Sequence, residues 1–150
     1  MTALLTPLAD AIVTDLNNSG LTPQFTAVRS NVPQNKREDL STLSVIVTPL
    51  RKVSESITRA KKKYTIDCYV LLQKGLQTDS NSETDPLIAL GEAITTRYDH
   101  GLSLTVGSLK ANCVGAVFGA DEDTSFLAVA RRQEALEYFG AILLRFELME

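Results

Sequence analysis

Two stretches of alternating apolar and polar residues restrict the fold of this chain more than any other feature. The clearer one is YTIDCYVLLQK, residues 64–74. The other is ALEYFGAILLRFEL, residues 135–148, with an apolar residue or glycine at every second position from Leu136 to Leu148. An apolar residue at every second position is the pattern of a strand that buries one face. The sequence therefore predicts two long strands, each with one face in a core.

Two other segments have the three- and four-residue apolar spacing of amphipathic helices. The first is predicted to begin with Thr6 as N-cap and Pro7 at the first helical position, and to end before Gly20. The second is predicted to begin in the same way at Asp85 and Pro86. The expected buried stripes are Leu5, Leu8, Ile12 and Leu16 in the first helix and Leu87, Leu90, Ile94 and Tyr98 in the second.

The rest of the chain supplies further strands. FTAVRS and LSVIVTP are predicted to be strands, and LSLTVGSLKANCVGAVFG is predicted to be one long strand. The polar segment VSESITRAKKKY is predicted to be a half-exposed strand or a hairpin arm. The segment FLAVARRQEALEY, residues 126–138, has helical propensity, which leaves the start of the last strand, near Gln133, open. The polar stretch at residues 75–85 is predicted to be a loop. The expected fold is one α+β domain over residues 1–150, with a mainly antiparallel sheet and two helices packed on it.

Composition and motifs argue against most enzymes and against a general DNA or membrane binder. The net charge is −3, Trp is absent, and aromatic residues make up 6%. His100 lacks a partner motif and is expected to lie at the surface or to cap the second helix, while the acids at residues 121–123 do not form a calcium loop. Cys68 and Cys113 are expected to be buried thiols, with a disulfide left open. We expect no catalytic residues, no cofactor and no metal. The N-terminus lacks the pattern of a signal peptide, so the chain is expected to be cytosolic when made.

The segment from Arg51 to Lys63 carries the strongest local charge, with six basic residues against one acidic residue. Such a run is usually a solvated face. The functional alternatives are contact with DNA phosphates or with acidic residues of a neighbouring copy, in 79–85, 121–123, Glu134 or Glu137. A polar elbow, residues 32–39, is also expected to contact a neighbour. The candidate contact residues are Gln34, Asn35, Lys36, Arg37, Arg51, Lys52, Arg59, Lys61, Lys62 and Lys63.

Several of these segments together resemble the tail-terminator or tail-completion proteins of tailed bacteriophages. The resemblance rests on the order and spacing of FTAVRSNVPQ, DLSTLSVIVTP, SITRAKKKYTIDCYVLLQK and DPLIALGEAITTRY, and it covers nearly the whole chain. The chain differs from the family near its last strand, where EYFGAILL stands in place of an Arg-x-Phe-hydroxyl element.

This resemblance implies a structural virion protein rather than an enzyme. Such a protein forms a ring, commonly a hexamer, at the head-proximal end of the tail tube. The ring ends tube polymerisation and is the docking surface for the head connector, and DNA passes through its lumen without sequence-specific binding. The expected location is the tail or neck of the virion, and the host cytoplasm during assembly, with no membrane contact. The alternatives are a head–tail connector or neck protein of the same particle, or a small DNA-binding accessory protein.

Overall fold

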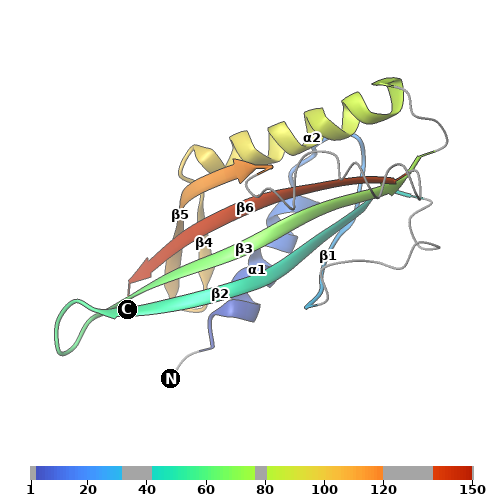
Figure 1. The fold of residues 1–150 in the computed structure, drawn as a ribbon. Coiled ribbons are helices and arrows are strands. Elements are labelled where there is room, and N and C mark those ends of the chain that lie inside the picture. The colour runs from blue at the N-terminus through green and yellow to red at the C-terminus, as the bar shows by residue number, and fades with distance from the viewer. Residues whose placement is uncertain (1–2, 32–41, 77–80, 120–136, 150) are drawn as a thin grey trace.

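The computed structural model describes residues 3–31, 42–76, 81–119 and 137–149, which form a curled sheet with two helices against it (Figure 1). In chain order the elements are α1 (Leu5–Asn17), β1 (Ala27–Arg29), β2 (Ser44–Ser56), β3 (Lys62–Gly75), α2 (Asn81–Asp99), β4 (Ser103–Val106), β5 (Leu109–Phe118) and β6 (Glu137–Met149). Neither helix is long and apolar enough to cross a membrane, within these described ranges.

The sheet has six strands in the order β1-β2-β3-β6-β5-β4. The short β1 pairs in parallel with β2, and every other neighbouring pair is antiparallel. The predicted α+β class with a mainly antiparallel sheet is therefore confirmed. Both helices lie on one face of the sheet, since their buried residues belong to the same apolar cluster as one face of β2, β3 and β6.

The long central strands show the predicted alternation. In β3, Ile66, Cys68 and Val70 point into the core beneath the helices, and Leu71 points to the opposite face. In β6, the core-facing residues are Tyr138, Ile142, Leu144, Phe146 and Leu148, all fully buried. Each fully buried Leu, Ile or Phe contributes about 1.5–3 kcal/mol of transfer free energy, so these two strands anchor the core.

Helix α1 begins earlier than the sequence predicts. Leu4 is its N-cap, and Thr6 and Pro7 are the second and third helical residues. Pro7 is tolerated there because the first four N–H groups of a helix have no partner within it. The predicted stripe holds for Leu8, Ile12 and Leu16, which are fully buried, while Leu5 is only partly buried. Gly20 has the expected left-handed backbone, with φ of +70°.

Helix α2 also begins earlier than predicted. It starts at Asn81, so Asp85 is not its N-cap and Pro86 lies inside the helix. The predicted loop at 75–85 is wrong at both ends, since Gly75 belongs to β3 and residues 81–85 are helical. Thr84 is buried, so the added turn packs against the body of the protein. The predicted stripe is confirmed: Leu87, Leu90, Ile94 and Tyr98 are all buried.

The single long strand predicted at residues 102–119 is instead a hairpin of β4 and β5. Gly107 makes the turn, with φ of +62°, a backbone angle that favours glycine. Gly115 lies at a register shift against β6, as its position inside a strand pattern suggests. Cys68 and Cys113 are both buried and free, so the disulfide left open by the sequence does not form.

Candidate interaction surface

The β2–β3 hairpin projects from the body of the molecule (Figure 1). From Leu50 to Lys62 every residue is exposed except the half-buried Lys52. The neighbouring β1 pairs only with Val45–Val47, so farther along β2 is the edge strand among the described residues. Pro49 lies inside β2 where this edge begins, a position that suits proline because its backbone cannot donate to a ladder hydrogen bond.

The turn of the hairpin is held by its own hydrogen bonds. The N–H of Ile57 donates to the carbonyl of Lys61 at 3.0 Å. The hydroxyl of Thr58 accepts hydrogen bonds from the N–H groups of Ala60 and Lys61. A side chain that bonds the backbone two and three residues on favours a tight turn. The tip is therefore an ordered polar turn that carries exposed cations.

The structure brings six of the predicted contact residues together on this hairpin. Three of them have partners: Arg51 bonds to Asp67, Lys63 pairs with Glu147, and the ammonium of Lys52 lies 5.2 Å from the Tyr64 ring centroid. The other three, Arg59, Lys61 and Lys62, are exposed at the tip and form no ion pair with a described residue. We call residues 50–62 the basic hairpin.

Two arginines share one carboxylate at the base of the hairpin, on the sheet face away from the helices. Arg51, Asp67 and Arg145 lie directly opposite one another on β2, β3 and β6. Arg145 donates from Nε to Asp67 at 2.8 Å, and Arg51 donates from Nε at 2.9 Å. The Asp67 side chain is only 4% exposed, whereas those of Arg51 and Arg145 are 60% and 46% exposed.

This arrangement lowers the pKa of Asp67. Hydrogen bonds from Arg145 are the largest cause, burial opposes them, and the bond and charge of Arg51 add to the decrease. Asp67 therefore stays ionised and orients both guanidinium groups at the base of the basic hairpin. Neither Asp67 nor Arg145 was a sequence-predicted site residue. The only sequence signal that could have indicated them is a charged residue on the polar face of a strongly alternating strand.

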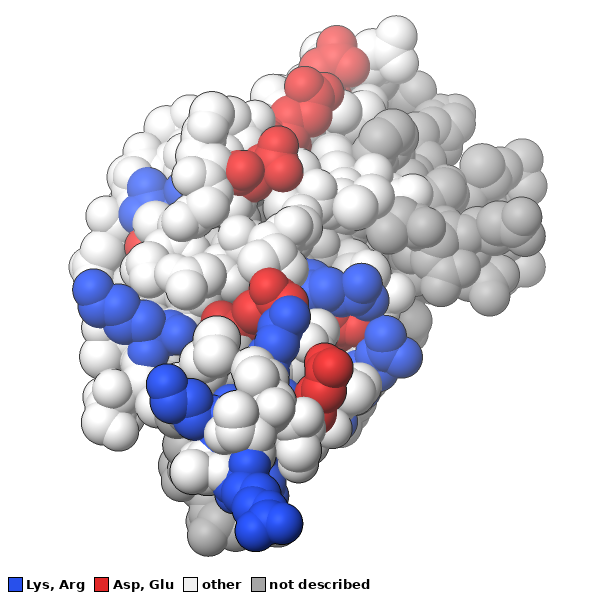
Figure 2. Space-filling model, turned by 90° about the vertical axis from the view of Figure 1, so that its left-hand side faces the viewer, with Lys and Arg blue, Asp and Glu red and all other residues white. Residues whose placement is uncertain are grey.

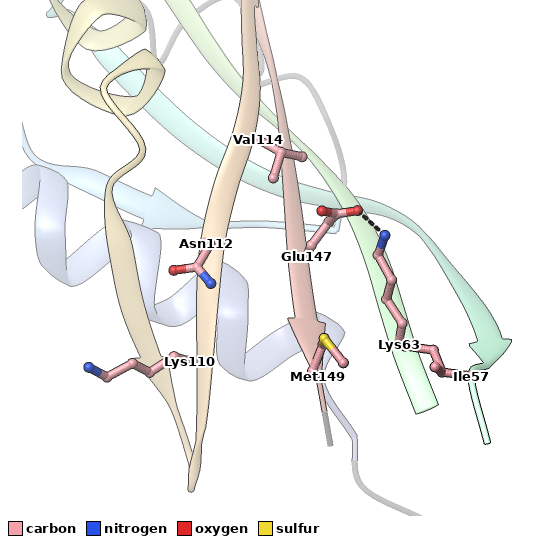
Figure 3. Close-up of a pocket in the computed structure, with 7 residues that line it drawn as sticks. All are labelled: Ile57, Lys63, Lys110, Asn112, Val114, Glu147 and Met149. Carbon is pink, nitrogen blue, oxygen red and sulfur yellow. Dashed lines mark ion pairs between the residues drawn. The ribbon is translucent and has the colours of Figure 1, made fainter. Parts of the chain in front are cut away.

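An open groove of about 570 Å³ lies beside the hairpin at the ends of the strands (Figure 3). Its lining comes from the turn, β3, β5 and β6 and comprises Ile57, Lys63, Lys110, Asn112, Val114, Glu147 and Met149. Ile57, Val114 and Met149 are each about half exposed. The groove mixes apolar side chains with the Lys63–Glu147 pair, which is the composition of a surface that another protein could cover.

The structure describes only some of the other residues that the sequence singled out. The contact residues Gln34, Asn35, Lys36 and Arg37, and the acidic residues Asp79, Asp121, Glu122, Asp123 and Glu134, lie outside the described residues. His100 directly follows α2 and is exposed. Within the described ranges, no group of three or more His, Cys, Asp or Glu side chains could hold a metal ion.

Comparison with known proteins gives information on the fold of this chain but none on its function. No protein-family model matches the sequence, and no curated protein matches it. A solved structure of a protein known only by a sequence identifier is similar over 95% of this chain and 94% of its own, with a TM-score of 0.58 and 14% sequence identity. An identity this low shows a shared fold alone.

Proposed function

We propose that this chain is a structural protein of a tailed bacteriophage that forms a ring at the head-proximal end of the tail tube. In this role it ends tube polymerisation and offers a docking surface to the head connector. The proposal starts from the order and spacing of sequence segments that resemble the tail-terminator family, and the α+β fold agrees with that resemblance.

The projecting basic hairpin is the observation that carries the proposal. This pair of strands leaves the body of the protein, with half-exposed Val53 and Ile57 and with tip cations that form no ion pair with a described residue, so it gains little from intramolecular packing. Exposed apolar side chains beside charges are typical of a surface that another protein covers. The half-exposed groove residues extend this surface onto the sheet. A ring subunit needs such a surface, because each copy must contact the next.

The direct test is assembly with tail tubes. Purified protein would be examined by native mass spectrometry and negative-stain imaging, alone and with polymerising tail tube protein. We expect a ring, commonly a hexamer, bound at one end of each tube, and an arrest of tube elongation. A protein that neither binds tube ends nor changes tube length would contradict the proposal.

The same samples separate the two alternatives. A neck protein would bind the portal-side connector ring in place of the tube end. A DNA-binding accessory protein would bind duplex DNA through the basic hairpin with an affinity that falls steeply as salt increases, because phosphate contacts release counterions. Binding to tube ends without DNA binding at low salt would exclude both.

A further inference from the structure

We propose that the basic hairpin of one copy docks on the exposed acidic stripe of α2 in a second copy. This inference rests on the proposed ring and names the two surfaces that would form its subunit contact. The partner of the hairpin surface is then a second copy of this chain, because the charges of the two surfaces are complementary.

The acidic stripe consists of Asp85, Glu92 and Asp99. These three residues are spaced seven apart, so they fall on one side of α2, and all three are exposed. None of them forms an ion pair with a described residue. The basic residue of this helix, Arg97, is bound to Asp15 of α1 and so does not neutralise the stripe. The exposed side of α2 therefore carries one carboxylate in each part of its length, and its one arginine does not offset them.

The two charged surfaces lie at opposite sides of the molecule. Figure 2 shows acidic side chains in a row along α2 and basic side chains gathered toward the hairpin. Within one copy the hairpin tip and α2 are well separated, because the body of the sheet lies between them (Figure 1). The tip cations and the stripe thus have no charge partner among the described residues of the same copy, and their charges are complementary to each other.

The two surfaces also have similar lengths. Fourteen residues separate Asp85 from Asp99, which corresponds to about 21 Å at the rise of an α-helix. The hairpin strand from Arg51 to Ser56 covers about 17 Å, and the turn that carries Arg59 and Lys61 extends it further. A hairpin lying along α2 could therefore bring cations near all three carboxylates. Exposed Val53 and Ile57 would lie against α2 at the same time.

Contact between two different surfaces has a consequence for symmetry. Because the hairpin tip and α2 lie at opposite sides of one copy, the proposed contact is heterologous, and each copy uses its hairpin toward one neighbour and its α2 toward the other. Such a contact produces rings when the rotation closes, whereas a twofold pairing of two hairpins would place like charges together. The placement of the two complementary surfaces on opposite sides of one copy therefore favours a ring over a twofold dimer.

The test is a charge exchange measured by native mass spectrometry and sedimentation velocity at low salt. The hairpin variant is Arg59→Glu with Lys61→Glu and Lys62→Glu, and the helix variant is Asp85→Lys with Glu92→Lys and Asp99→Lys. We expect each variant alone to self-associate at least tenfold more weakly than the wild type. One chain that carries all six substitutions should regain the wild-type mass, because the complementary charges have exchanged places.

Controls separate a lost contact from a lost fold. Each variant should keep a cooperative thermal transition and the wild-type circular dichroism. Asp10→Lys, an exposed acid on α1, should leave the mass unchanged. The inference is overturned if either triple variant keeps the wild-type assembly, if the six-substitution chain stays dissociated, or if the wild type remains a monomer at low salt. These results leave the proposed function standing as long as the wild type still caps tail tubes. Failure to cap them would overturn the proposed function itself.

Discussion

The carboxylate of Asp15 in α1 accepts two hydrogen bonds from the guanidinium group of Arg97, which lies 82 residues farther along the chain in α2. The donors are Nε at 2.9 Å and Nη2 at 2.8 Å, and the hydroxyl of Tyr98 donates to the same carboxylate at 2.8 Å. One partly buried carboxylate, with a side chain 14% exposed, thus joins the two helices that cover the core. The same contact holds the Arg97 side chain toward α1 and away from the acidic stripe.

We expect Asp15→Asn to destabilise the protein by about 1.5–3 kcal/mol, the range for hydrogen bonds to charged groups, because Arg97 and Tyr98 lose an ionised acceptor. Urea denaturation gives the free energy of unfolding. The matched control is Asp10→Asn on the same helix. Its ion pair with Arg29 is exposed, so its removal should change that free energy by no more than about 0.5 kcal/mol. Equal losses in the two variants would show that the Asp15 contact is no stronger than a surface pair.

Stability should fall in acid through Asp15 and Asp67. At Asp15 burial raises the pKa, but the hydrogen bonds from Arg97 and Tyr98 outweigh burial, so the pKa is lower in the folded state. The pKa of Asp67 is lowered chiefly by Arg145. Groups with depressed folded pKa values bind more protons in the unfolded chain. Their stabilisation is therefore complete above the unfolded value of about 3.9 and is lost as pH falls through the folded values.

The measurement is the urea midpoint between about pH 2 and pH 6. The wild type should lose stability steadily below about pH 4, and Asp67→Asn should show a shallower loss over the same window. If Asp67→Asn loses stability with falling pH as steeply as the wild type does, the pKa of Asp67 is the same in the folded and unfolded chains.

Replacement of Gly91 by alanine should destabilise α2, although alanine normally favours a helix by about 0.5–1 kcal/mol. A Cβ atom at this position would lie 2.2 Å from the ring of Phe118 at the end of β5. Because overpacking of this kind typically costs about 1–3 kcal/mol, we expect a net loss of stability and a lower Tm. The second variant, Gly91→Ala with Phe118→Leu, removes the ring and should recover part of the loss. An increase in Tm for Gly91→Ala alone would contradict the close packing of α2 on β5.

Both cysteines should resist thiol reagents while the protein is folded. Burial, with the nearby charge of Asp67, raises the pKa of Cys68 to about 12, and burial also raises the pKa of Cys113. Only the thiolate reacts, so at pH 8 almost none of either group is reactive. Labelling followed by mass spectrometry should give little modification in buffer and two labels per chain in denaturant. Rapid labelling of native Cys68 would mean that the free energy of local opening of β3 is small.

Much of the fold could be predicted because the alternation in β3 and β6 and the stripe in α2 are local patterns. Ile66, Ile142 and Leu90 point where their spacing indicates, since backbone geometry sets the direction of each side chain. The wrong predictions concern where helices and strands begin and end. The start of α2 and the turn at Gly107 depend on packing and on backbone angles that neighbouring residues do not determine.

The candidate site was predictable only in part. The charge of the segment from Arg51 to Lys63 is evident in the sequence, and so is its hairpin character. The partners of those charges are not. Asp67 lies 16 residues from Arg51 and 78 from Arg145, and it meets both because β3 is paired with β2 on one side and β6 on the other.

By itself, the sequence determined which faces of the strands and helices are buried, the α+β class and the concentration of positive charge near residues 51–63. The tertiary structure alone decided that this charge projects at the edge of the sheet, which of the cations pair with described residues, and that the acidic side of α2 lies away from them. The reason is that periodicity is a property of neighbouring residues. Strand order and ion pairing arise only when segments far apart in the chain bury their apolar faces together.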